Sequence, residues 1–199
     1  MKKKRFNIDA SNNCILPEVI EDLTDFSDWN EELPKRLAYF NDSNEERNGV
    51  TYLALFVELE IYRTATIIFP DFKKYLGNAS FSNAISLIRS FRLLPDHILD
   101  ATNCIRDIRN HFAHDIEIVD LDRLPKKSID RLNQFVECYD GDYHYFELDD
   151  TLLNRYKTLC TNVIAALRIY EPSIRIVRDY LDSGKVQFEY RSRQKPRSF

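Results

Sequence analysis

Apolar residues recur along most of this chain at the three- and four-residue spacing that places them on one face of an α-helix. One long stripe runs from about residue 45 to residue 69, where Pro70 ends it. A similar pattern runs from Pro17 to Phe40, with Pro34 placed to start a helical turn. The spacing therefore predicts helices in both stretches.

Two further helices are predicted in the middle of the chain. Ser80 is a suitable N-cap for a helix over residues 80–93, because its hydroxyl can accept a bond from a free backbone N–H. Pro95 suits the first turn of a second helix over residues 96–113, which should end near His114. Capping residues and apolar spacing therefore agree on this pair.

The last part of the chain mixes clear helices with less regular segments. Residues 116–124 are ambiguous, since their apolar positions also fit a short extended piece. A helix is predicted from about 128 to 138, followed by a loop over 139–150 that is dense in Asp and Tyr. A final long helix starts near residue 149, and Pro172 should kink or restart it.

These elements predict an all-α fold, a helical bundle with short irregular loops and a C-terminal helical extension. The chain has only 4 glycines among 199 residues, which argues against a many-stranded β fold. One domain is expected over residues 17–182, between an irregular basic arm at 1–16 and a basic tail at 183–199.

Charge narrows the classes of partner. The net charge of −4 and the pI of about 5.6 argue against a protein that binds nucleic acid by electrostatics alone. Basic residues nevertheless collect at both ends of the chain, from Lys2 to Arg5 and from Lys185 to Arg197. Two interpretations stay open, namely solvated ends that aid solubility or basic arms that guide nucleic acid to a site.

The 4 cysteines lie far apart and form no CxxC pair, so neither a zinc site nor a disulfide framework is expected. No apolar stretch is long enough to cross a bilayer, and polar residues interrupt any signal-peptide core after the basic N-terminus. These features predict a cytoplasmic protein with no membrane partner.

The most chemically distinctive residues lie at the end of the second middle helix. Arg106, Arg109 and Asn110 share one face through their spacing of three and four residues. His114 follows Asn110 by four residues and should lie next to it, whereas Asp107 is turned away from Arg106 by about 100°. The helix can therefore present a polar surface while its other face stays in the core.

Such a set of side chains suits phosphodiester chemistry. Arginine offers a planar fork of donors to phosphate oxygens, and histidine, with an ordinary pKa of about 6.5, moves protons near neutral pH. Asparagine can orient the imidazole or bind substrate. RNA supplies its own nucleophile, the 2′-hydroxyl, so no metal or other cofactor is required. The competing interpretation is a helix end where these residues only cap and form ion pairs.

The run from Ile105 to His114, IRDIRNHFAH, resembles the signature of the HEPN superfamily, an Arg often followed by Asn with a His about five positions after the Arg. It is most similar to the branch grouped with the mannitol operon repressor, whose Arg-Asn-x-Phe-Ala-His core matches Arg109 to His114. In that branch a helix opened by a Phe-Ser segment precedes the core, and here that segment is Ser80 to Leu87, followed by Leu93-Leu94-Pro95. The resemblance covers about residues 50–135.

The resemblance implies a dimerising bundle with a HEPN-like core at about 50–135 plus the helix at 149–182, and two motifs facing each other across the interface. Active members cleave RNA without a metal, leave a 2′,3′-cyclic phosphate, and act as toxins, in antiviral defence or in RNA processing. Carried over, Arg109 binds the scissile phosphate, His114 is the general acid or base, and Asn110 positions them.

Arg106 and His111 lie outside the motif, and only their place on the helix suggests that they bind substrate. The acidic charge and the long C-terminal extension depart from the family pattern. Three hypotheses therefore stand: a metal-independent endoribonuclease, a noncatalytic regulator that resembles the mannitol repressor and works through a protein partner, and a domain whose motif only caps a helix. The first predicts RNA as substrate, a homodimer, and an antitoxin or regulatory protein as a further partner.

Overall fold

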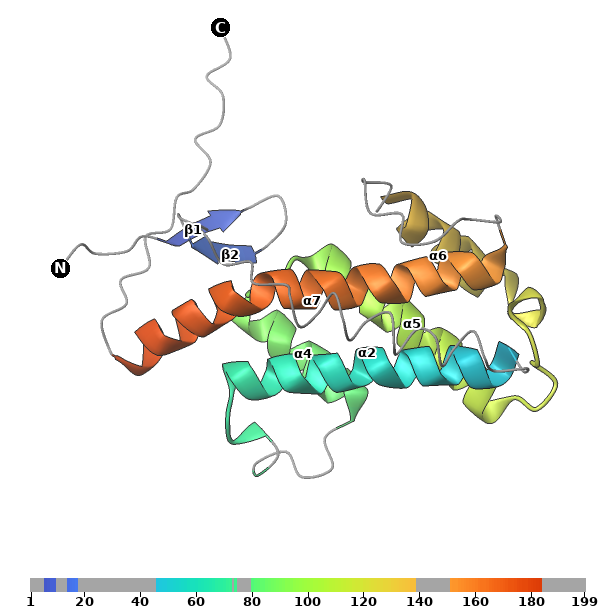
Figure 1. Ribbon diagram of the computed structural model, residues 1–199, viewed down its shortest axis with the longest axis horizontal. Coiled ribbons are helices and arrows are strands. Elements are labelled where there is room, and N and C mark those ends of the chain that lie inside the picture. The colour runs from blue at the N-terminus through green and yellow to red at the C-terminus, as the bar shows by residue number, and fades with distance from the viewer. Residues whose placement is uncertain are drawn as a thin grey trace, which may run out of the picture.

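A computed structural model describes residues 6–9, 14–17, 46–72, 74, 80–138 and 151–183 of the chain (Figure 1). The fold is an all-α helical bundle accompanied by one small hairpin, as the helical spacing predicts for the bundle. The predicted helix within residues 17–40, the loop at 139–150 and the basic tail beyond Ser183 lie outside the described residues. The elements are strands β1 (Phe6–Asp9) and β2 (Cys14–Pro17), helices α2 (Glu46–Ile68), α4 (Phe81–Phe91), α5 (Asp96–His114), α6 (Lys126–Cys138) and α7 (Leu152–Asp182), and the 3-10 helix η1 (Leu121–Arg123).

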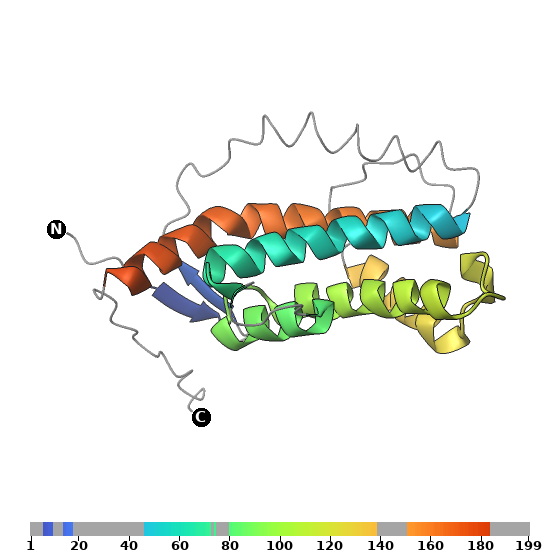
Figure 2. The same ribbon diagram turned by 90° about the horizontal axis from the view of Figure 1, so that it is seen from below.

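The bundle has two layers. The long helices α2 and α7 lie side by side in one layer, and α4, α5 and α6 form the other (Figure 2). Helix α5 packs against α2, α4, α6 and α7, so it is the central helix of its layer. Among the described residues, no helix is both long and apolar enough to cross a membrane.

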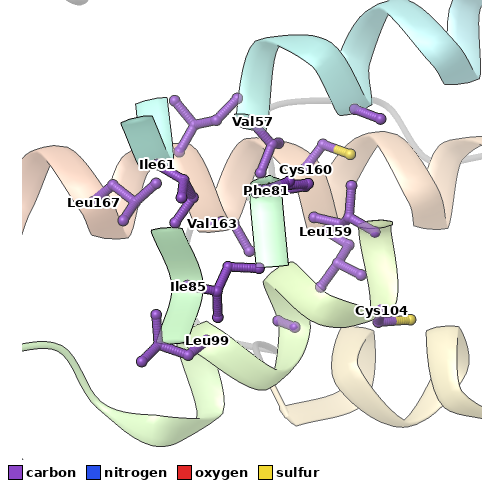
Figure 3. Close-up of a cluster of buried hydrophobic side chains, with 14 of the residues drawn as sticks. Val57, Ile61, Phe81, Ile85, Leu99, Cys104, Leu159, Cys160, Val163 and Leu167 are labelled. Carbon is purple, nitrogen blue, oxygen red and sulfur yellow. The ribbon is translucent and has the colours of Figure 1, made fainter. Parts of the chain in front are cut away.

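The predicted apolar stripe of α2 is buried in the core between the layers. Val57 and Ile61 of α2 meet Ile85 of α4, Leu99 of α5 and Val163 of α7 in this core (Figure 3). All five side chains are at most 2% exposed. Burial of a side chain of this size stabilises the fold by about 1.5–3 kcal/mol, so this contact region holds the layers together.

One segment differs from the sequence-based expectation, and a second one was ambiguous from the sequence. Within the arm at 1–16, predicted to be irregular, β1 and β2 pair as an antiparallel hairpin in which Ile8 is opposite Ile15. This pairing joins residues that no helical periodicity links. Between α5 and α6, the chain forms a turn and η1 instead of an extended piece. Ile118, Leu121 and Leu124 are buried at a spacing of three, which suits a helical turn.

Helix α7 continues through Pro172, so the predicted restart is wrong, whereas the predicted kink stays a prediction. A proline inside a helix costs about 3 kcal/mol because it removes a hydrogen bond and crowds the preceding turn. The flanking side chains Leu167, Ile174 and Val177 are all buried, and their packing offsets this cost. Tertiary contacts therefore keep α7 a single element.

Candidate functional site at the end of helix α5

The start of α2 holds the end of α5 in place. The Arg47 guanidinium donates to the backbone carbonyls of Phe112, Ile116 and Ile118. These carbonyls lie at the C-terminal end of α5 and in the turn that follows, where the helix dipole is negative and favours a cation. The beginning of α2 therefore sets where α5 stops, one residue before Asp115.

One face of α5 lies in the core, as the apolar spacing predicts. Ile105 and Ile108 are fully buried, and Phe112 is 1% exposed. This anchored face leaves the polar residues of the last two turns at the opposite surface. The motif therefore stands on a helix whose orientation is set by packing.

An open hollow of about 470 Å³ lies over the last two turns of α5. Asn110 and His114, predicted to be neighbours, both line it, together with Asp107, His111 and Asp115. His114 is exposed and Asn110 is partly exposed, so both can reach a ligand in the hollow. The hollow is wide enough for a nucleotide-sized group and is open to solvent.

Arg109 lies beside this hollow and does not line it. Its Nη1 is 3.4 Å from Asn110 Oδ1, and its Nη2 is 3.7 Å from Glu58 Oε2 on α2. Tyr62 donates from its hydroxyl to Glu58 Oε1 at 3.0 Å. Burial and this bond to Glu58 raise the pKa of Tyr62 to about 12. Glu58 thus holds the arginine from a neighbouring helix.

Sequence analysis missed Glu58 because it lies far earlier in the chain than the motif. No pattern in the sequence pointed to it, because its contact with Arg109 depends on how α2 packs against α5.

Arg106 shares a helix face with Arg109 and Asn110 by its spacing, but its side chain forms an ion pair with Asp107. Its guanidinium donates to Asp107 Oδ1, with Nη2 at 2.8 Å, although Asp107 follows it directly. Successive residues of α5 are still turned by about 100°, and the long arginine side chain reaches around the helix to meet Asp107. Asp107 also accepts from Arg131 Nη1 of α6 at 2.8 Å. Arg106 therefore belongs to an ion-pair cluster at the border between α5 and α6.

His111 lies where α5 faces α6. Its Nε2 is 3.4 Å from Ser128 Oγ, in the first turn of α6. It lines the open hollow and also a second cavity, of about 240 Å³, between the two helices. Lys127 and Arg131 of α6 line this second cavity too, and sequence analysis missed both. Their four-residue spacing places them on one face of α6, which is the signal that could have found them.

The site therefore combines a guanidinium, an amide and two imidazoles around adjoining hollows, groups that bind anions and transfer protons. Within the described part of the chain, no group of three or more His, Cys, Asp or Glu side chains is placed to hold a metal ion. Comparison with known proteins adds no assignment, because no family model, no curated protein and no solved structure matches this chain.

Proposed function

We propose that this protein is a metal-independent endoribonuclease of HEPN-like type, acting as a homodimer in toxin or antiviral-defence biology. One observation carries the proposal: Asn110 and His114 line the same open hollow, and Arg109 lies within hydrogen-bond distance of Asn110. A phosphate bound over Asn110 would be within reach of a proton-transfer group and a guanidinium. That arrangement fits the IRDIRNHFAH run and its resemblance to the HEPN signature.

The proposed reaction uses the substrate's own nucleophile. The 2′-oxygen of a ribose attacks the adjacent phosphorus while one His114 imidazole accepts the 2′-hydroxyl proton. The bond from phosphorus to the 5′-oxygen breaks, and the His114 imidazolium of a second copy of the chain donates a proton to that leaving oxygen. The products are a 2′,3′-cyclic phosphate and a 5′-hydroxyl. Arg109 stabilises the charge on the phosphate oxygens.

A specific observation favours a second candidate, a noncatalytic regulator that acts through a protein partner. Arg109 is 3.7 Å from Glu58, and this acid competes with phosphate for the guanidinium. In the regulator, the Arg109–Glu58 pair persists and the motif serves the packing of α5. In the nuclease, bound phosphate draws Arg109 away from Glu58.

RNA cleavage by matched histidine variants tests the proposal. His114→Ala should lower cleavage of a labelled RNA by about 10²–10⁴-fold, the usual contribution of a general acid or base. His97→Ala is the matched control, because His97 is also an exposed histidine of α5 but lies in its first turn. Arg109→Lys should also fail, since lysine lacks the bidentate fork. Chelator should leave cleavage unchanged.

Two results would overturn the nuclease. One is equal cleavage by wild type and His114→Ala, when thermal unfolding shows that both proteins are folded. The other is absence of cleavage across several RNAs together with a monomeric state at micromolar concentration in sedimentation. A homodimer with no cleavage would favour the regulator.

A further inference from the structure

The second cavity, between α5 and α6, has a composition that the catalytic proposal does not use. It holds about 240 Å³, small for a whole drug-sized ligand but sufficient for a phosphate with part of its sugar. Lys127, Ser128 and Arg131 line it from α6, and Asp107 and His111 from α5. Four of these five side chains can donate a hydrogen bond, and His111 does so in either protonation state.

The charges around the cavity favour an anion. Its one carboxylate, Asp107, is already bound by Arg106 and Arg131, each at 2.8 Å. Among the described residues, Lys127 forms no ion pair, so its ammonium is available to a ligand in the cavity that it lines. The two cations that line the cavity, Lys127 and Arg131, outnumber its one carboxylate, so the cavity carries an excess of positive charge.

The position of α6 adds to this preference. Lys127 and Ser128 belong to the first turn of α6, which begins at Lys126, and the N-terminal end of a helix carries partial positive charge. The Ser128 hydroxyl is 3.4 Å from His111 Nε2, so both face the same space. Hydroxyl, imidazole, ammonium and guanidinium therefore converge from two helices.

The cavity adjoins the hollow over the motif. Asp107 and His111 line both spaces, so a chain bound over Asn110 and His114 can extend past His111 towards Lys127. Arg131 is also oriented towards this border, since it donates to Asp107 and lies 5.7 Å from the centre of the Phe135 ring. The two spaces follow the border between α5 and α6 as one path.

From this geometry we infer that the α5–α6 cavity is a phosphate subsite that binds the RNA phosphate next to the one at Asn110 and His114. This inference rests on the proposed endoribonuclease function and names where its substrate is held. Lys127, Ser128 and Arg131 bind the phosphate oxygens, and His111 orients the strand between the two spaces. These are binding residues, and the proton transfers stay with His114.

Binding of an RNA analogue that cannot be cleaved tests the subsite. The probe is a fluorescein-labelled, single-stranded 2′-O-methyl oligonucleotide, whose blocked 2′-oxygen cannot attack phosphorus. With the full-length chain, Lys127→Ala should weaken binding about tenfold, the loss expected for one charge-assisted bond. The slope of log K against log salt should fall by about 0.7, one phosphate contact on a single strand.

The neighbouring lysine provides the matched control. Lys126 is exposed, lies one residue earlier in the same turn and does not line the cavity. Lys126→Ala should therefore change binding less than Lys127→Ala and leave most of the salt slope in place. Inorganic phosphate and a mononucleotide, added as competitors, distinguish a strand phosphate from a free one. If both competitors displace the oligonucleotide only weakly, the subsite binds a phosphate within a strand. If the mononucleotide displaces the oligonucleotide at equal concentration, the assignment of a strand-phosphate subsite is overturned.

The outcomes separate the subsite from the catalytic proposal. Equal affinities for Lys126→Ala and Lys127→Ala would overturn the subsite even if wild type cleaves RNA. A selective loss of binding in Lys127→Ala would support the subsite even if no RNA is cleaved, and then only the nuclease fails. Thermal unfolding of both variants establishes that each is folded.

Discussion

Two clusters of ion pairs, each with two arginines around one acid, lie between different helices and differ in solvent exposure. Between α2 and α7, Glu60 is bound by Arg168 at 2.6 Å and by Arg63 at 3.3 Å, and its side chain is 7% exposed. Between α5 and α6, Asp107 is bound by Arg106 and Arg131 at 2.8 Å, and its side chain is 40% exposed. Glu60 and Asp107 are each bound by two arginines, but the side chain of Asp107 is much more exposed to solvent than that of Glu60.

The difference indicates which cluster supports the fold and which is accessible to solvent. A buried carboxylate that loses its partners leaves an uncompensated charge, so the α2–α7 cluster must stay intact. Exposed ion pairs contribute about 0–1 kcal/mol, so the α5–α6 cluster can exchange partners at little cost. Only the second cluster borders the two cavities of the candidate site, at Asp107.

The largest expected effect lies in the buried cluster. Glu60→Ala should lower the free energy of unfolding by about 3 kcal/mol, because Arg168 loses its closest carboxylate between two packed helices. Urea unfolding followed by circular dichroism measures this. The double variant Glu60→Met with Arg168→Met should recover most of the loss, since an apolar pair replaces the charges. A loss below about 1 kcal/mol in Glu60→Ala would remove the distinction between the clusters.

Replacement of Arg47, which binds backbone carbonyls and not a carboxylate, should have an intermediate effect on the free energy of unfolding. Arg47→Met should cost about 1.5–3 kcal/mol, because carbonyls at the end of α5 lose a charged donor. Hydrogen exchange should accelerate in residues 111–115 more than in α4. Uniform exchange across α4 and α5 would contradict a local role for Arg47.

The exposed cluster should be far less sensitive. Asp107→Asn should change the free energy of unfolding by less than about 1 kcal/mol, because both of its ion pairs are partly exposed to solvent. The same urea experiment, run beside Glu60→Ala, makes the comparison direct. Equal losses in the two variants would mean that exposure does not separate the clusters.

The smallest effect concerns pH and Glu46, which is partly buried. Burial raises the pKa of Glu46 above its ordinary value of 4.5, with Asp120 and Asp122 adding to the rise and the bond from the Leu121 N–H opposing it. The folded chain therefore holds this proton more tightly than the unfolded chain, and stability falls as pH rises from about 4.5 through the raised pKa.

Glu46→Gln should remove that part of the pH dependence while the amide oxygen still accepts from Leu121. Thermal unfolding between pH 4 and pH 8 should show a flatter profile for the variant, with wild type relatively less stable at the upper end. An unchanged slope would show that other groups set the pH dependence.

The sequence alone determined helices α2, α4 and α5 and which side of each of them is buried. Spacing of three and four residues is a local property, so α2, α4, α5 and the inward face at Ile105 and Ile108 could be predicted. The same periodicity predicted that Asn110 and His114 would be neighbours. It missed the hairpin, because pairing of β1 with β2 follows a period of two in a short segment.

Only the tertiary structure decided what surrounds the motif. The contact of Arg109 with Glu58 joins α5 to α2, and the contact of His111 with Ser128 joins α5 to α6. Neither follows from periodicity, because each depends on how separate helices pack and on which rotamer a long side chain adopts. The physical reason is that a helix face is set by neighbours in sequence, whereas a site is set by neighbours in space.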